Sequence, residues 1–324
     1  MSAHKNQPTL QDIYAARRRL QPYLRETPLL HSPWLSSVAD AMVELKVESL
    51  QLTSSFKIRG ALNATLRLVA ATASPPTIVT ASAGNHGRAI ALAAERLGVR
   101  AIVFTPATAP DTKKAAIRRH GAELRDDSPN YDAAELAARE YAQLEGAVYI
   151  SPYNHPDVIA GAGTIGLEIL EAAPTLDVVI VPVGGGGLIS GLALAIKTAA
   201  PGVRVVGVEV DASRPFAIGI ERGAITEIDV GASLADGLTG NLEPAAMTFE
   251  LVRRHVDDLV SVSEDDLERA IRGLVSEDHL VAEGAGAAAA AAVIAHKAVR
   301  RGQRAVVMLT GANIDLAKLA AIVA

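Results

Sequence analysis

The feature that most constrains the fold is the regular alternation of short apolar runs with longer amphipathic stretches. Segment 42–48 alternates apolar and polar residues, and apolar runs follow at 77–80, 101–104, 147–150, 177–183, 204–210, 259–262 and 304–310. Most of them are separated by Ala- and Leu-rich stretches of helix length, such as 58–71. Strands that alternate with helices predict βαβ units, and therefore a largely parallel sheet covered by helices on both faces.

Chain length and helix-terminating residues indicate how this α/β chain is divided into domains and helices. Its 324 residues correspond to about two domains at roughly 150 residues each. No low-complexity linker and no internal repeat separates them, so we expect interleaved domains between which the chain crosses more than once. Ser263 and Asp266 predict a capping box that opens a helix, and Gly202 and Gly302 predict helix stops.

Composition excludes several classes of function. The net charge of -5 and the 3% of aromatic residues argue against a nucleic-acid partner. Because the chain has no cysteine, disulfides, cysteine-ligated metals and thiol nucleophiles are excluded. The N-terminus lacks the apolar core of a signal peptide, and the longest apolar run, 285–295, is too short to span a bilayer. We therefore expect a cytoplasmic protein with no membrane partner.

The strongest chemical signal is a run of four glycines, Gly184, Gly185, Gly186 and Gly187, between a predicted strand and a predicted helix. Ligands of parallel α/β proteins bind beyond the carboxyl ends of the strands. Glycines at a helix N-terminus leave backbone N–H groups free to hold a phosphate. The alternative is a tight turn without a ligand, but such a turn rarely needs four glycines. Neither common nucleotide-binding motif fits the run.

Three further turns follow or precede predicted elements in the same way. Lys57 lies at a strand-to-helix junction beside Phe56, where partial desolvation would lower its pKa and make its amine able to form an imine. A lysine is usually only a solvated surface residue. The other two turns offer hydroxyl, amide and carboxylate groups, although each alone could be an ordinary helix start: Ser82-Ala83-Gly84-Asn85-His86-Gly87 and Thr310-Gly311-Ala312-Asn313, with Glu283 nearby.

Together these motifs resemble the fold-type II pyridoxal-phosphate enzymes, in the branch of serine/threonine dehydratases (threonine ammonia-lyases) and serine racemases. The resemblance covers nearly the whole chain and rests on S-S-F-K-I-R-G-A, S-A-G-N-H-G, the glycine quartet with L-I-S-G, A-D-G-L and E-G-A-G-A, in the order of the family. It implies a tryptophan synthase β-like fold with two interleaved domains, each a mostly parallel twisted sheet flanked by helices. The large cofactor-binding domain would comprise 1–72 and 154–324 and the small mobile domain 73–153, with no C-terminal regulatory domain.

The resemblance also implies a role for each motif residue. Lys57 would carry pyridoxal 5'-phosphate as an imine and take the α-proton of the substrate. The other cofactor-binding residues would be Phe56, Asn85, Asn154, Gly184, Gly185, Gly186, Gly187, Gly237, Glu283 and Thr310. The substrate carboxylate would lie among Ser82, Ala83, Gly84, Asn85 and His86. The expected reaction releases a 2-oxo acid and ammonia from L-threonine or L-serine, and a homodimer is expected.

Several positions depart from the family pattern. Ala83 stands where serine racemases carry the serine that acts on the opposite face of the substrate, which predicts elimination without efficient racemisation. Glu209 matches one ligand of the divalent cation found in racemases and related dehydratases, but Pro215 replaces its aspartate partner. A divalent or monovalent cation at Glu209 thus remains a hypothesis. Ala162 and Ala312 also replace the usual Gln and Gly.

The sequence is compatible with several other functions. The same elimination on 3-hydroxyaspartate would want a further cation, for which Arg59 and Arg88 are candidates, and a serine racemase or a cysteine-synthase-like β-replacement is less favoured. A nicotinamide-dependent oxidoreductase would explain the glycines followed by Glu209, but not Lys57. A ligand sensor without turnover would keep the motifs. The sequence leaves the preferred substrate and any nucleotide effector undetermined.

Overall fold

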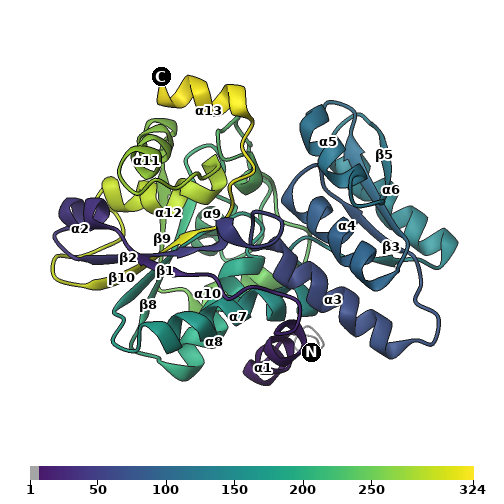
Figure 1. The fold of residues 1–324 in the computed structure, drawn as a ribbon, viewed down its shortest axis with the longest axis horizontal. Helices are drawn as coiled ribbons and strands as arrows, with labels where there is room; N and C mark the ends of the chain where they lie inside the picture. Colours follow the sequence, from purple (N-terminus) through teal and green to yellow (C-terminus); the bar gives the residue numbers. More distant parts are fainter. Residues whose placement is uncertain (1–6) are drawn as a thin grey trace.

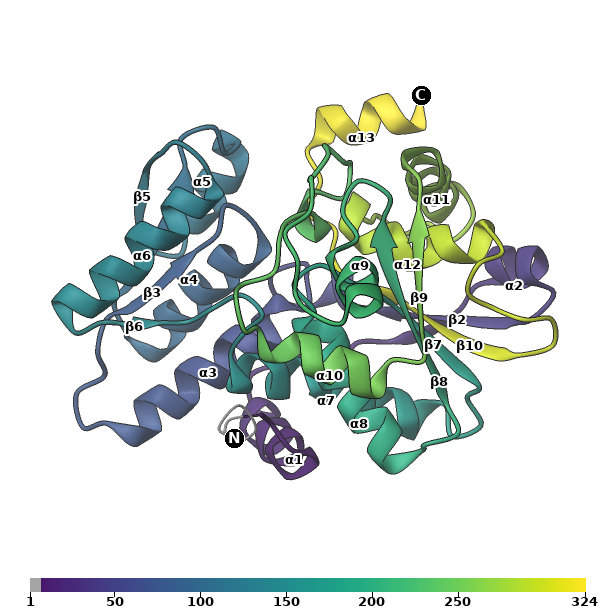
Figure 2. The same cartoon turned by 180° about the vertical axis from the view of Figure 1, so that it is seen from behind.

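The computed structural model describes residues 7–324 as two α/β units, each built on its own sheet (Figures 1 and 2). The six-stranded sheet has the order β1-β2-β10-β7-β8-β9 and is parallel except for β1, which pairs antiparallel with β2. The four-stranded sheet has the order β5-β4-β3-β6 and is parallel throughout. The α/β class with mostly parallel sheets is therefore confirmed.

The strands of the large sheet are β1 (Leu29–His31), β2 (Met42–Val47), β7 (Val178–Pro182), β8 (Arg204–Val210), β9 (Asp258–Val262) and β10 (Arg304–Leu309). Those of the small sheet are β3 (Ile78–Ala81), β4 (Ala101–Pro106), β5 (Glu123–Ser128) and β6 (Val148–Tyr149). The helices are α1 (Leu10–Leu20), α2 (Pro33–Ala39), α3 (Lys57–Ala71), α4 (Asn85–Leu97), α5 (Asp111–Arg118), α6 (Tyr131–Glu145), α7 (Pro156–Ala172), α8 (Gly187–Ala199), α9 (Pro215–Arg222), α10 (Met247–His255), α11 (Glu264–Ser276), α12 (Gly284–Ile294) and α13 (Leu316–Val323), with 3₁₀ turns η1 (Glu48–Leu50) and η2 (Asp236–Leu238).

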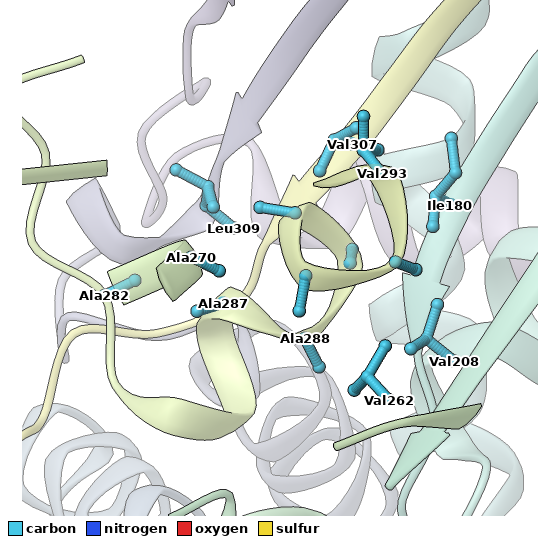
Figure 3. Close-up of a cluster of buried hydrophobic side chains, with 14 of the residues drawn as sticks. Ile180, Val208, Val262, Ala270, Ala282, Ala287, Ala288, Val293, Val307 and Leu309 are labelled. Carbon is cyan, nitrogen blue, oxygen red and sulfur yellow. The ribbon is translucent and has the colours of Figure 1, made fainter. Parts of the chain in front are cut away.

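Both faces of the large sheet are buried, as its continuous apolar strands require. Val178 and Ile180 of β7 face the cluster around α12 (Figure 3), while Val179 and Val181 face α7 and α8. α12 is buried and consists mostly of alanine and glycine, so its backbone lies close against the sheet and its small side chains fill the space. In the small unit, α4 and α6 likewise cover opposite faces of the sheet.

The predicted strands are found, with their ends shifted by at most two residues, but two strands were missed. β5 reads ELRDDS and has no apolar run, because it is an edge strand that pairs only with β4. β1 has only three residues and lies at the edge of the large sheet, beside β2. Neither β1 nor β5 contains an apolar run long enough to predict a strand. The capping box of Ser263 and Asp266 is confirmed at the start of α11.

The small unit is inserted into the sequence of the large unit. β1 and β2 precede the small sheet and β7 to β10 follow it, so the chain enters the small unit once and returns once. α3 lies between the two units in both views and packs against α4 on one side and α7 on the other. The division at 72 and 153 remains a prediction. None of the helices in residues 7–324 combines the length and apolarity needed to cross a bilayer.

Candidate active site

A cavity of about 1080 Å³ lies where the carboxyl ends of strands from both sheets face each other. The loops that follow β3, β7 and β10 line it, together with the start of α3. This is the position at which parallel α/β folds bind ligands. The structure thus brings together motifs that are separated by more than two hundred residues in the sequence, including Lys57, Asn85, Gly184 and Thr310.

Lys57 is the first residue of α3 and its side chain is partly buried in the cavity wall. Its Nζ donates to the carbonyl oxygen of Pro152 at 3.0 Å and lies 5.2 Å from the centre of the Phe56 ring. Burial lowers the pKa of Lys57 to about 8, against a smaller opposing effect of the Glu283 carboxylate. A substantial fraction of the amine is therefore neutral near physiological pH, as imine formation requires.

The glycine quartet forms the turn from β7 into α8, and its glycines are required by close contacts. A Cβ on Gly185 would lie 2.3 Å from the ring of Tyr153, and one on Gly187 would lie 2.9 Å from the Tyr153 backbone. Gly186 has φ of 83°, and a Cβ there would meet the Phe216 ring at 2.5 Å. No side chain of residues 7–324 caps α8. Its first N–H groups are therefore left for an anion, in a turn that has no room for side chains.

The loop after β3 lines the same cavity through all of its predicted residues, which are Ser82, Ala83, Gly84, Asn85 and His86. A Cβ on Gly84 would meet nothing within 4 Å, so the backbone there is open to a ligand. His86 is buried with Nε2 3.3 Å from the carbonyl oxygen of Ile150. Burial, reinforced by the positive charge of Lys57, lowers the pKa of His86 to about 3. His86 is therefore neutral and a poor general base.

Glu283 precedes α12 and contacts the loop after β3 from the large unit. Asn85 Nδ2 donates to Glu283 Oε1 at 2.5 Å. Burial raises the pKa of Glu283 to about 7, although the hydrogen bond from Asn85 opposes this. Thr310 is buried at the end of β10 with its Oγ1 3.4 Å from the carbonyl oxygen of Ala285, and Gly237 completes this wall. These predicted residues surround one end of the cavity.

Asn154 lies behind the cavity wall and holds that wall in place. Its Nδ2 donates to Glu243 Oε2 at 3.0 Å, and its Oδ1 accepts from the N–H of Met247 at 2.9 Å. Tyr153, whose ring covers the glycine quartet, also accepts from the N–H of Glu243 at 2.8 Å. Tyr153 was missed although it lies beside Asn154 in the segment S-P-Y-N-H-P. Nothing in the sequence pattern marks Glu243.

Glu209, the predicted metal ligand, lies away from the cavity and caps α9. Its carboxylate accepts from the N–H groups of Phe216 at 2.9 Å and Ala217 at 3.0 Å. Burial raises its pKa to about 7, although these two hydrogen bonds oppose the change. The part of the chain described contains no group of three or more His, Asp or Glu side chains placed to hold a metal ion. The cation at Glu209 remains a hypothesis, and the geometry explains the residue as a helix cap.

These observations fit pyridoxal phosphate. The quartet at the uncapped start of α8 would hold its phosphate, and Lys57 presents an amine of lowered pKa to the same cavity. Phe56, Asn85 and Thr310 line the same cavity as that amine. The two demands of the cofactor, an anion site and a reactive amine, are thus met within one cavity.

Comparisons with known proteins point the same way. The family described as "Pyridoxal-phosphate dependent enzyme" matches residues 20–311. The L-threonine ammonia-lyase of Thermotoga maritima is 42% identical over 308 residues, which cover 95% of this chain and 76% of that protein. Among solved structures, the threonine deaminase of T.th. has a TM-score of 0.88 and 39% identity, covering 95% of this chain and 99% of that one. Maize serine racemase has a TM-score of 0.89 and 31% identity, covering 97% and 96%.

Proposed function

The chain belongs to the family of pyridoxal-phosphate-dependent enzymes, and we propose that it is an ammonia-lyase that converts L-threonine, L-serine or both to a 2-oxo acid and ammonia. The observation that carries the proposal is the amine of Lys57, which has a pKa lowered to about 8 and lines the same cavity as the uncapped start of α8. The likeness to L-threonine ammonia-lyase and threonine deaminase over 95% of the chain supports this choice of substrate.

Different residues of the site would bind the cofactor and the substrate. Gly184–Gly187 would hold the phosphate of the cofactor, Phe56 and Asn85 would flank its ring, and Thr310 would meet the ring nitrogen. When bound, the cofactor stabilises negative charge that develops on the α-carbon of the substrate. The substrate carboxylate would be held by the backbone and hydroxyl of Ser82 to Gly84.

Lys57 then acts as the general base. With its Nζ free and neutral, Lys57 would take the α-proton of the substrate, and a proton returned to the β-hydroxyl would let it leave as water. The eliminated product takes up one water and gives a 2-oxo acid and ammonia. His86 is a poor proton acceptor, because burial lowers the pKa of its imidazole to about 3. Thr310 is uncharged, so it leaves the ring nitrogen without a counter-charge.

One observation favours a second candidate, the same elimination on 3-hydroxyaspartate. Arg88 lines the cavity and forms no ion pair within residues 7–324. Its charge is available to a second carboxylate on the substrate. Arg59, the other candidate from the sequence, is occupied by two buried carboxylates. Racemisation is less favoured, since Ala83 offers no acid or base at the cavity wall.

A substrate panel tests the proposal. Purified protein is incubated with L-threonine, L-serine, D-serine and the 3-hydroxyaspartate isomers, and release of 2-oxo acid is followed. We expect fastest release from L-threonine or L-serine, reduced about a thousandfold or more in Lys57→Ala. Release from a hydroxyaspartate alone would transfer the assignment to the second candidate. Absence of release from every substrate, by protein that contains cofactor, would contradict elimination.

We also propose that the chain acts as a homodimer in the cytoplasm, as the resemblance to the family suggests. Sedimentation equilibrium of the cofactor-loaded protein checks the first point, and fractionation of the producing cells checks the second. A monomer at micromolar concentration would contradict the dimer.

A further inference from the structure

Two asparagines and a glutamate form a continuous hydrogen-bonded row along one wall of the cavity. Asn313, in the segment after β10, donates from Nδ2 to Asn85 Oδ1 at 2.6 Å. Asn85, at the start of α4, donates in turn from Nδ2 to Glu283 Oε1 at 2.5 Å. The row joins the small unit to the large one, and all three residues line the cavity.

The direction of the row is fixed at Asn313. Arg88 donates from a guanidinium nitrogen to Asn313 Oδ1 at 2.6 Å, and Asn313 Nδ2 donates to the carbonyl oxygen of Thr53 at 2.9 Å. A guanidinium can only donate and a backbone carbonyl can only accept. An amide presents one acceptor end and one donor end, so both neighbours impose the same orientation on Asn313. Its second N–H must then point at Asn85.

The orientation passes to Asn85 by the same rule. Because Asn313 offers Asn85 a donor, Asn85 must turn its Oδ1 toward Asn313 and its Nδ2 toward Glu283 and the cavity. With the opposite orientation, Oδ1 of Asn85 would face the Glu283 carboxylate, and two acceptors would be in contact unless Glu283 held a proton. Asn85 alone could adopt either orientation, since an amide side chain is nearly symmetric in shape.

We propose that Asn313, held by Arg88 and Thr53, is a positioning residue that makes Asn85 a hydrogen-bond donor toward the cofactor. The inference rests on pyridoxal phosphate as the cofactor and not on which amino acid is the substrate. The pyridine ring of that cofactor carries a hydroxyl group on carbon 3, whose oxygen is called here the 3-oxygen. This carbon is next to the ring carbon that bears the aldehyde group, which reacts with Lys57. A donor next to this oxygen stabilises its anionic form, whereas an acceptor favours the protonated form. Asn313 therefore controls the protonation of the bound cofactor without touching it.

The test is Asn313→Asp, which keeps the size of the side chain and removes its donors. The introduced carboxylate offers only acceptors, so Asn85 is expected to turn its Nδ2 toward position 313 and its Oδ1 toward the cavity. Bound pyridoxal phosphate absorbs at longer wavelength when its 3-oxygen is anionic. We expect a lower ratio of the long-wavelength to the short-wavelength band, and cofactor affinity weaker by about tenfold, the loss expected for one charge-assisted hydrogen bond.

Control variants distinguish an effect of Asn313 on the orientation of Asn85 from a general effect of an added negative charge. Asn130→Asp introduces the same charge at the N-cap of α6, where aspartate caps equally well, and should leave the spectrum unchanged. Asn85→Ala tests the route: in that background Asn313→Asp should no longer change the band ratio, because there is no amide left to turn. Arg88→Lys, which also only donates, should retain the wild-type band ratio, whereas Arg88→Glu should lower it.

Several results would contradict a positioning role of Asn313. A band ratio and affinity in Asn313→Asp equal to those of the wild type would overturn the inference. So would an equal shift with and without Asn85, since Asn313 would then act by another route. If Asn313→Asp does not fold, Asn313→Ala leaves Asn85 free to turn, and a smaller shift of the same sign that depends on Asn85 is expected. Absence of that shift would also overturn the inference. All readouts are spectroscopic, so they stay informative if the substrate assignment is wrong.

Discussion

At the scale of single residues, the reactivity of Lys57 follows from where its amine is placed. The first residue of α3 extends from the helix start into the cavity, where its one hydrogen-bond acceptor among the described residues is the Pro152 carbonyl. Burial removes solvation from the ammonium ion, and Glu283 is the only carboxylate that opposes this effect on the pKa of Lys57 within residues 7–324. The lysine is therefore tuned by its surroundings and not by an adjacent base.

A pH profile checks this placement. The neutral amine is the form that attacks the cofactor aldehyde, and it is populated above its pKa. After removal of the cofactor, the rate of its recapture should rise as pH increases through about 8, and not through 10.5 as for a solvated lysine. Glu283→Gln removes a charge that raises the pKa of Lys57, so the profile should move to lower pH. Stopped-flow absorbance measures both, and a profile that is unchanged in Glu283→Gln would exclude the coupling.

The glycine quartet makes a second prediction at this scale. Gly185→Ala places a methyl group 2.3 Å from the Tyr153 ring, so Tyr153 or the turn must move out of the phosphate cradle. We expect cofactor affinity to fall by about a hundredfold, the loss of a well-made anion site. Gly202→Ala is the matched control, because a Cβ there meets nothing within 4 Å. Equal affinities of the two variants, measured by fluorescence titration, would contradict the role of the turn.

At the scale of elements, α3 is held by buried charges and not by a cap. No side chain of the described residues caps its N-terminus. Instead Arg59, in its first turn, bonds Glu48 at 2.7 Å and Glu168 of α7 at 2.5 Å, and Lys46 of β2 bonds Glu168 at 2.6 Å. Two positive and two negative side chains thus lie together out of solvent, and they fix the turn that carries Lys57. Removing one member leaves the others uncompensated.

Two glutamates on α7 provide a matched comparison of this effect. Glu168→Gln should lower the free energy of unfolding by about 3 kcal/mol, because Arg59 and Lys46 stay buried with less compensation. Glu171→Gln, on the next turn of the same helix, breaks an ion pair with Arg17 that is largely exposed, and should cost less than about 1 kcal/mol. Urea unfolding of both variants measures the difference. Equal losses would show that the buried group is not what secures α3.

Most strands and most residues of the candidate site could be predicted from the sequence. Apolar runs located the parallel strands because those strands are buried on both faces, and strand ends located Lys57, Asn85, Gly184–Gly187 and Thr310. The family, its fold and its cofactor are confirmed by the comparisons. The charged edge strand β5 was missed because it carries no apolar signal. Tertiary partners were not predictable either: the sequence left Arg59 as a candidate for the substrate, whereas folding pairs it with Glu48 and Glu168.

At the scale of the whole molecule, Glu243 connects the two units beside the cavity. Its carboxylate accepts from Ser151 at 2.7 Å and Asn154 at 3.0 Å, in the segment that returns to the large unit, and from Arg139 of α6 at 2.7 Å. Lys113 of α5 and Asp236 form a second contact between the units at 2.6 Å. These bonds join the small unit to the large unit beside the cavity, which Ser82 to His86 and the glycine quartet both line.

Glu243→Ala should loosen this connection. We expect KM for the amino-acid substrate to rise about tenfold while the cofactor spectrum is retained, because Lys57 bonds the backbone of Pro152 and Tyr153 bonds the backbone of Glu243, and the substitution keeps both backbone groups. Hydrogen exchange in residues 151–154 should increase as well. Glu250→Ala is the control, since its ion pair with Arg253 lies within α10 and is exposed. Unchanged KM and exchange in Glu243→Ala would remove Glu243 from this role.

The assignment of the cofactor to Lys57 can be tested without any substrate. Borohydride reduction fixes pyridoxal phosphate to the lysine that holds it, and peptide mass mapping then identifies that residue. We expect modification of Lys57 alone, and none in Lys57→Ala. Modification of Lys113, which also lines the cavity, would contradict the assignment and with it the division of roles among the residues of the site.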